Sequence, residues 1–154
     1  MQLGDFIAPE AVFPSLKAKN KKQLLQELAA RAAVFTGLEE RYIFDVLLQR
    51  ERLGSTGLGQ GIAIPHGKFA GLKGIVGIFA RLVEPIDFDA VDAEPVDIVF
   101  LLLAPEGAGA DHLKALARIS RLLRDGVAVE KLRASKDAAA LYAVLTEEAA
   151  SHAA

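Results

Sequence analysis

The apolar segment of residues 96–103, VDIVFLLL, constrains the fold more than any other part of the sequence. Apart from Asp97, every residue in it is apolar, without the alternation that a strand with one solvent-exposed face would show. Such a run is typical of a central β-strand that is covered on both faces. The longest uninterrupted apolar stretch, residues 98–104, is far shorter than the roughly 20 residues that cross a bilayer. The segment therefore predicts a sheet with a doubly covered central strand.

The rest of the chain alternates between helical and extended patterns. Strands are predicted at residues 61–64 and 74–83, followed by turns around a short extended piece before residue 96. The glycine-rich residues 54–61 are expected to form a loop. Helices are predicted from the capping box Asn20–Gln23 to Gly37, at 38–52, at 110–124, around 129–133 and from the N-cap Ser135 onward. We therefore expect residues 1–154 to form a single α/β domain with helices on the sheet faces.

Composition and charge exclude several classes of function. The 154 residues carry a formal net charge of −2, which provides no global positive field for nucleic acid or an anionic membrane. Cysteine is absent, which excludes disulfides, thiolate-bound zinc and thiol nucleophiles. The N-terminal residues MQLGDFIAPE lack the basic and apolar regions of a signal peptide. A cytoplasmic protein without nucleic-acid partner or membrane insertion is expected.

His66 stands in the segment GIAIPHGK, residues 61–68, at the end of a short apolar strand. Pro65 fixes its own backbone torsion and favours extended geometry at Ile64, which carries the predicted strand straight to the histidine. Gly67 would then provide a turn that leaves the ring accessible. An imidazole held in this way suits a nucleophile or a general base, although a histidine satisfied within an ordinary turn fits the same spacing.

Three further features are candidates for a site, each with an ordinary alternative. Residues 54–61, GSTGLGQG, could bind phosphate through backbone N–H groups or form a flexible connector, and they match neither a P-loop nor a dinucleotide-binding motif. Arg50 could pair with phosphate oxygens or simply complement a helix end. His112 occupies a first helical turn, where the dipole favours an anion, but it could be a bystander. His152 is expected on the solvated surface.

Together these residues resemble the phosphorylation-site region of enzyme IIA domains of the bacterial phosphotransferase system. The class concerned is the mannitol, fructose and nitrogen-regulatory class. The similarity begins with RERLGSTG at 50–57 and GIAIPHGK at 61–68. It continues through PIDFDA at 85–90, PVD at 95–97 and HL at 112–113, in the expected order. It therefore covers most of the chain and implies a mixed β-sheet with helices packed on both faces.

The resemblance implies a role for each matching residue. His66 would accept a phosphoryl group from a histidine phosphocarrier protein. His112 would hydrogen-bond the phosphorylated ring or the phosphoryl oxygens, and Arg50 would balance the phosphoryl charge. The phosphoryl-binding loop would consist of Gly54, Ser55, Thr56 and Gly57. No cofactor is expected, and metal is not required because no nucleotide phosphate must be clamped.

Two destinations of the phosphoryl group occur in this class. Transport members pass it to a IIB domain and then to a sugar such as fructose or mannitol. Nitrogen-regulatory members are free-standing and act on target proteins through their phosphorylation state. The chain carries no appended IIB-like or membrane segment, and its flanking GSTG and Gly67-Lys68 match the regulatory type, which we expect here. Lys114 departs from that type, since some regulatory members carry a further histidine there.

Two interpretations from other classes stay open at this point. A metal site could combine His66 and His112 with a carboxylate such as Asp111 or Glu51, although no ligand spacing within one element indicates it. Alternatively, the chain could be a binding module in which His66 is inert. Docking of a carrier protein would need an apolar patch near His66. The candidates for it, each of which could equally belong to the core, are Ile62, Ile64, Phe69 and Leu72.

Overall fold

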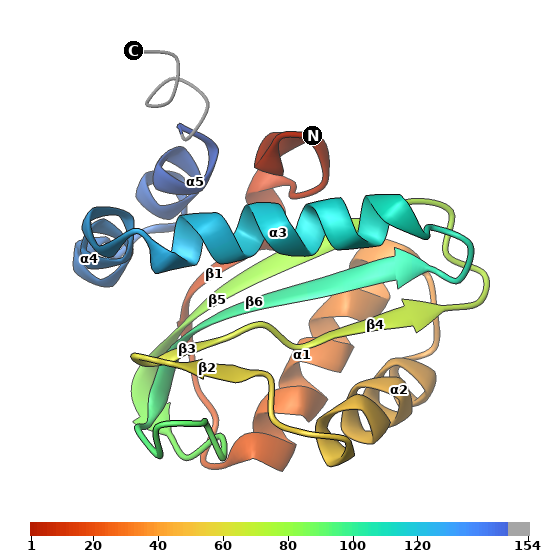
Figure 1. Cartoon of the computed structure of the whole chain (residues 1–154), viewed down its shortest axis with the longest axis horizontal. Helices are drawn as coiled ribbons and strands as arrows, with labels where there is room; N and C mark the ends of the chain where they lie inside the picture. Colours follow the sequence, from red (N-terminus) through yellow and green to blue (C-terminus); the bar gives the residue numbers. More distant parts are fainter. Residues whose placement is uncertain (148–154) are drawn as a thin grey trace.

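The apolar segment forms β6 (Val96–Pro105), the middle strand of a six-stranded sheet, in the computed structural model of the chain (Figure 1). The structure describes residues 1–147. Strand order is β1 (Val12–Leu16), β5 (Val76–Ile86), β6, β3 (Ile62–Ala63), β2 (Gly57–Gly59), and β4 (His66–Phe69) pairs with β6 beyond β3. β5 runs antiparallel to β6, while β3 and β4 run parallel to it, so the sheet is mixed as expected.

β3 and β4 form one interrupted strand along β6. Ile62 lies opposite Ile98 and His66 lies opposite Leu102, so both strands keep the same register. The interruption falls at Ile64 and Pro65, where the Pro65 carbonyl still accepts a hydrogen bond from the Leu102 N–H at 3.0 Å. Pro65 itself has no N–H to donate, which explains why the regular ladder breaks there. His66 is therefore the first residue after the break.

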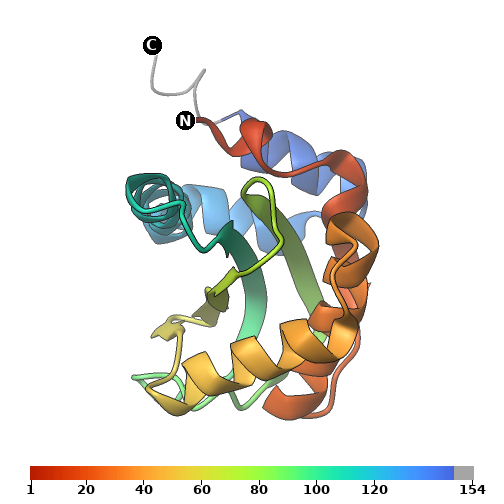
Figure 2. The same cartoon turned by 90° about the vertical axis from the view of Figure 1, so that its right-hand side faces the viewer.

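Helices cover both faces of the sheet (Figures 1 and 2). α1 (Lys21–Thr36) and α2 (Glu40–Arg52) pack together on one face, where they contact β5 and β4. α3 (Ala110–Arg124) crosses the other face over β6. α4 (Gly126–Ala134) and α5 (Ala138–Thr146) continue from α3, and α5 packs beside β1 and the short N-terminal helices η1 (Leu3–Asp5) and η2 (Pro9–Ala11). Within residues 1–147, no helix is both long and apolar enough to span a membrane.

The predicted helix ends are correct for α1 and α3 and wrong near the C-terminus. Asn20 caps α1 by accepting from the Gln23 N–H at 2.8 Å, and Gly37 ends it in the left-handed conformation. The predicted range 110–124 is that of α3. The N-cap of α5 is Asp137, not Ser135, because the Asp137 carboxylate accepts from the Ala140 N–H at 2.8 Å. The turn expected around residues 129–133 is the longer helix α4, and His152 lies outside the described residues.

Three strands were not predicted from the sequence. β1 was not expected, and β2 falls within the glycine-rich segment that was expected to be all loop. β4 begins where a turn after His66 was predicted. The short segments carry little periodicity of their own, and each is a strand because it pairs with a longer neighbour, β1 with β5 and β4 with β6.

Gly67 lies within β4 and permits close helix packing, instead of forming the turn that was predicted. A Cβ atom there would lie 2.8 Å from Cγ1 of Val46 on α2. Side chains alternate between the faces of a strand, so Gly67 faces α2 while the neighbouring His66 faces α3. The glycine therefore sets the distance between α2 and the strand that carries the histidine.

The variant Gly67→Ala is expected to lower the free energy of unfolding by about 1–3 kcal/mol, because overpacking forces the helix and strand apart. Urea unfolding followed by circular dichroism measures the change. Gly74→Ala is the matched control, since nothing lies within 4 Å of a Cβ atom at Gly74. An equal loss in both variants would contradict the packing role, whereas recovery in Gly67→Ala/Val46→Ala would support it.

Candidate functional site

His66 is anchored by its own backbone neighbourhood and remains half-buried. Its Nδ1 atom lies 2.8 Å from the carbonyl oxygen of Ile64, two residues earlier in the chain. A carbonyl can only accept, so Nδ1 must carry the proton and donate it. In a neutral ring Nε2 then holds the lone pair, and within residues 1–147 this atom has no hydrogen-bond partner and is not buried. The ring therefore presents an unprotonated nitrogen to solvent.

His112 comes from the first turn of α3 and meets His66 across the face of the sheet. The two ring centroids are 5.8 Å apart with an interplanar angle of 68°. His112 is buried, and its Nε2 atom has no hydrogen-bond partner among the described residues. The sequence placed these two histidines on separate elements 46 residues apart, and the fold brings their rings into contact.

Both histidines favour the neutral form. Burial lowers the pKa of His66 below its usual 6.5, and the Arg50 guanidinium lowers it further, while the Ile64 carbonyl and the Glu51 carboxylate act in the opposite direction. Burial also lowers the pKa of His112, with smaller contributions from His66 and Lys68. A neutral imidazole keeps the lone pair that a nucleophile or a general base needs.

Arg50 lies in the last turn of α2, close enough to His66 for its charge to affect the ring. Its Nη1 atom donates to the Gly54 carbonyl at 2.9 Å, which fastens the side chain to the start of the glycine-rich loop. The guanidinium group has five N–H donors, so this contact leaves others for an anion. The structure thus brings Arg50, His66 and His112 to one region, as the resemblance implied.

The loop of residues 54–57 is less open to a ligand than the sequence suggested. The Gly54 N–H donates to the Glu51 carbonyl, the Thr56 N–H to the Glu51 carboxylate and the Gly57 N–H to the Ser55 hydroxyl. Of the four N–H groups, only that of Ser55 lacks a partner within residues 1–147. The loop is therefore held rigidly and offers one backbone donor.

Glu51 is the residue whose part in this region the sequence analysis missed. Its carboxylate is buried and accepts hydrogen bonds from the N–H and the hydroxyl of Thr56. Lys21, the first residue of α1, forms an ion pair with it at 3.0 Å. A carboxylate in the last turn of a helix interacts unfavourably with the helix dipole. This position was the one signal in the sequence that Glu51 has a specific partner.

The apolar residues nearest to His66 in sequence belong to the core. Ile62, Ile64 and Phe69 are 4%, 3% and 0% exposed, and Leu72 packs partly buried against the core, so none of them forms an open docking patch. Two of the exposed apolar residues instead follow site residues along the chain. Leu53 lies 85% exposed three residues after Arg50, and Leu113 lies 68% exposed directly after His112.

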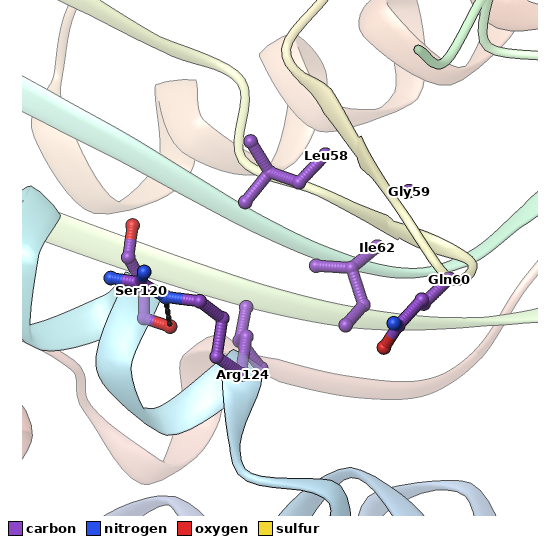
Figure 3. Close-up of a pocket in the computed structure, with 7 residues that line it drawn as sticks. Leu58, Gly59, Gln60, Ile62, Ser120 and Arg124 are labelled. Carbon is purple, nitrogen blue, oxygen red and sulfur yellow. Dashed lines mark hydrogen bonds between the residues drawn. The ribbon is translucent and has the colours of Figure 1, made fainter. Parts of the chain in front are cut away.

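An open groove of about 640 Å³ lies between the β2–β3 hairpin and the second half of α3 (Figure 3). The side chains of Leu58 and Ile62 point into it from the hairpin, and Ser120 and Arg124 border it from α3. His66 and His112 are not among its lining residues. This groove is therefore separate from the site around His66.

The arrangement leaves Glu51 unsuited to the alternative metal site, because its carboxylate is already engaged by Thr56 and Lys21. In the part of the chain that the structure describes, no three histidine or acidic side chains are grouped as metal ligands would be.

Comparison with known proteins gives concordant results. Residues 5–148 match the family model described as phosphoenolpyruvate-dependent sugar phosphotransferase system, EIIA 2. The chain is 65% identical over 145 residues to the nitrogen regulatory protein of Bradyrhizobium diazoefficiens, covering 94% of this chain and 95% of that protein. The crystal structure of nitrogen regulatory protein IIA-Ntr from Neisseria meningitidis matches with a TM-score of 0.89 and 37% identity, covering 94% of this chain and 99% of that one.

A more distant structure shares the fold alone. A chain in the complex of enzyme IIA and phosphorylated enzyme IIB of the mannitol system from Escherichia coli matches with a TM-score of 0.77 and 20% identity. It covers 90% of this chain and 95% of that one. The enzyme IIA resemblance and the mixed sheet inferred from the sequence are both confirmed.

Titration of the histidines tests the electrostatics of the site. His66 and His112 are expected to titrate with midpoints below 6.5 in NMR spectra recorded against pH, because burial penalises the charged ring. Removing the guanidinium in Arg50→Gln is expected to raise the His66 midpoint relative to the wild type, since that charge lowers it. A midpoint at or above 6.5 for wild-type His66, or a downward shift in Arg50→Gln, would contradict this description.

Proposed function

Because this chain belongs to the EIIA 2 family of the phosphoenolpyruvate-dependent sugar phosphotransferase system, we propose that it is a phosphoryl-relay protein. His66 accepts a phosphoryl group from a histidine phosphocarrier protein, and the chain acts as a regulator through its phosphorylation state. It is thus a phosphotransferase with a nitrogen atom as acceptor. The side chains proposed to take part in phosphoryl transfer are those of His66, His112 and Arg50.

The hydrogen bond from Nδ1 of His66 to the Ile64 carbonyl is the observation that carries this proposal. It assigns the proton to Nδ1, and so the acceptor is Nε2, which faces solvent where a partner's phosphohistidine can approach. The lowered pKa of His66 keeps that nitrogen unprotonated at neutral pH. A bystander histidine needs neither feature.

The chemistry balances without any group outside the two proteins. The Nε2 lone pair of His66 forms a bond to phosphorus while the bond from phosphorus to the carrier's imidazole nitrogen breaks, and that bond's electron pair stays on the carrier nitrogen. His66 keeps its proton on Nδ1, and the carrier ring, protonated on its other nitrogen, leaves as neutral imidazole. The transition state is loose, with charge spread over three oxygens, so catalysis is mainly positioning and charge stabilisation. Arg50, His112 and the Ser55 N–H supply the charge and donors. Because a histidine replaces a histidine, the step is reversible.

Docking of the carrier is supported by two exposed leucines that follow site residues in the chain. Leu53 and Leu113 are exposed and follow Arg50 and His112 closely in the chain, and the site residues Arg50, His66 and His112 are themselves polar. A small apolar contact area with polar surroundings suits a partner that must bind and leave repeatedly. This pair replaces the candidates around His66 that proved to be core.

The regulatory role rests on the relatives. The proteins with 65% and 37% identity are both named nitrogen regulatory proteins and are covered almost completely by this chain. The alternative is a transport component that donates the phosphoryl group to a IIB domain, as the mannitol IIA–IIB complex illustrates for its own system. Both roles use the same phosphorylation site, and they differ only in the molecule that follows.

Phosphoryl labelling tests the relay directly. After incubation with phosphoenolpyruvate, enzyme I and a phosphocarrier protein, wild-type protein is expected to gain one acid-labile phosphoryl group in intact-mass analysis, and His66→Ala none. The rate is expected to fall below the His66 pKa, since protonation removes the lone pair. Full labelling of His66→Ala would contradict the assignment of the acceptor.

His112→Ala is expected to remain labelled but more slowly, by roughly 10-fold to 1000-fold if one preorganised donor is lost. Stopped-time labelling at fixed carrier concentration measures the rate, and circular dichroism confirms the fold. Wild-type speed in His112→Ala would remove His112 from the transfer step.

The downstream role is tested by mixing the labelled protein with fructose-type and mannitol-type IIB domains. A regulator is expected to keep its phosphoryl group, apart from transfer back to the carrier, because a IIB domain is not its partner. Rapid and complete transfer to a IIB domain would favour the transport alternative.

A further inference from the structure

Glu51 is a buried charged residue that direct phosphoryl contact does not explain. Its side chain is 3% exposed, and both carboxylate oxygens are engaged. One oxygen accepts from the Thr56 N–H at 3.1 Å and pairs with Lys21 at 3.0 Å, and the other accepts from the Thr56 hydroxyl. Burying a carboxylate costs free energy unless it is paired in this way, so such a group indicates a specific purpose.

We propose that Glu51 is a positioning residue for the phosphoryl acceptor, acting on His66 through Thr56 and Ile64. The inference rests on the proposed function, in which His66 is the acceptor. Glu51 does not touch the reacting nitrogen. It holds Thr56, whose carbonyl binds the N–H of Ile64, and the Ile64 carbonyl in turn accepts from the ring.

The connection is a continuous series of hydrogen bonds. Glu51 holds Thr56 through its N–H and hydroxyl, and the Thr56 carbonyl accepts from the Ile64 N–H at 3.1 Å. The Ile64 carbonyl then accepts from Nδ1 of His66 at 2.8 Å. Each link fixes the next, so a displacement of Thr56 moves the carbonyl that sets the tautomer of His66.

Lys21 ties this series to the N-terminal end of α1. Its ammonium group pairs with Glu51, lies 4.6 Å from the centre of the Phe88 ring and lies 3.8 Å from the Asp89 carboxylate. The Ser55 hydroxyl donates to the Phe88 carbonyl at 2.8 Å, so the same loop is held from two directions. The carboxylate at residue 51 is therefore the junction of α1, α2 and the loop before β2.

The consequence for the reaction is control of the tautomer. Transfer needs the proton on Nδ1 and the lone pair on Nε2. If Thr56 and Ile64 relax, the carbonyl that accepts from Nδ1 loses its position, and the tautomer with the proton on Nε2 becomes populated. In that tautomer Nε2 has no free lone pair, so the exposed nitrogen cannot form the bond to phosphorus. The negative charge of Glu51 also raises the pKa of His66, against the effect of Arg50.

Glu51→Gln and Thr56→Val test the proposal in the intact chain. Both keep the side-chain shape and remove one element of the pairing, and each is expected to slow phosphoryl labelling by roughly 10-fold to 100-fold, as small misplacements of a reacting group do. Thr56→Ser, which keeps the hydroxyl, is expected to label at nearly the wild-type rate. The exposed carboxylate Glu40 on the same helix supplies the matched control, Glu40→Gln.

Nitrogen-15 NMR of the His66 ring separates positioning from a general loss of structure. Wild type is expected to show the proton on Nδ1, and Glu51→Gln and Thr56→Val a mixture of tautomers. Loss of the carboxylate charge is expected to lower the His66 titration midpoint in Glu51→Gln, and to leave it unchanged in Glu40→Gln. Wild-type labelling rates with an unchanged tautomer in both variants would overturn the role of Glu51.

The two proposals fail in distinguishable ways. If wild-type protein gains no phosphoryl group from carriers that label a control acceptor, the proposed function fails, and the tautomer measurement alone decides whether Glu51 positions the ring. If wild type is labelled and the variants behave like Glu40→Gln, the function stands and the positioning role is wrong. A Glu51→Gln protein that does not fold leaves Thr56→Val, read against Thr56→Ser, to decide.

Discussion

The burial of β6 on both faces is the constraint on which the rest of the structure depends. Every residue from Ile98 to Ala104 is fully buried, and each large apolar side chain removed from water contributes roughly 1.5–3 kcal/mol. A strand without exposed backbone must have its N–H and C=O groups paired on both edges, so β5 pairs along one side and β3 and β4 along the other. The helices on each face keep the apolar side chains of β6 away from water.

The site follows from the strand that pairs with β6 and from the helix that comes after it. Because β4 pairs with the last part of β6, and α3 returns over the sheet soon after β6 ends, His66 and His112 come into ring contact. The break at Pro65 releases the Ile64 carbonyl from the regular ladder, and it is free to accept from Nδ1 of His66. Glu51 and Thr56 hold that segment from the α2 side.

Much of this could be predicted from local signals, and the exceptions have a common physical cause. The Asn20 cap, the Gly37 stop and the range of α3 were correct because caps and helical periodicity act within a few residues. β2 and β4 were missed because strands of three and four residues are stabilised by their partners and not by their own sequence. Gly67 was assigned to a turn because its packing against Val46 of α2 leaves no sign in the neighbouring residues.

The sequence by itself determined the enclosed central strand, the helices and the candidates His66, His112 and Arg50, because residue type and spacing encode burial and chemistry locally. Only the tertiary structure decided which groups meet. The assignment of the proton on His66 depends on the carbonyl of Ile64, whose direction is set by the broken strand. The pairing of the buried Glu51 carboxylate depends on Lys21 and Thr56, which contact it from another helix and from a loop. The position of the proton and the pairing of the carboxylate both depend on contacts between segments far apart in the sequence, and no local sequence pattern indicates such contacts.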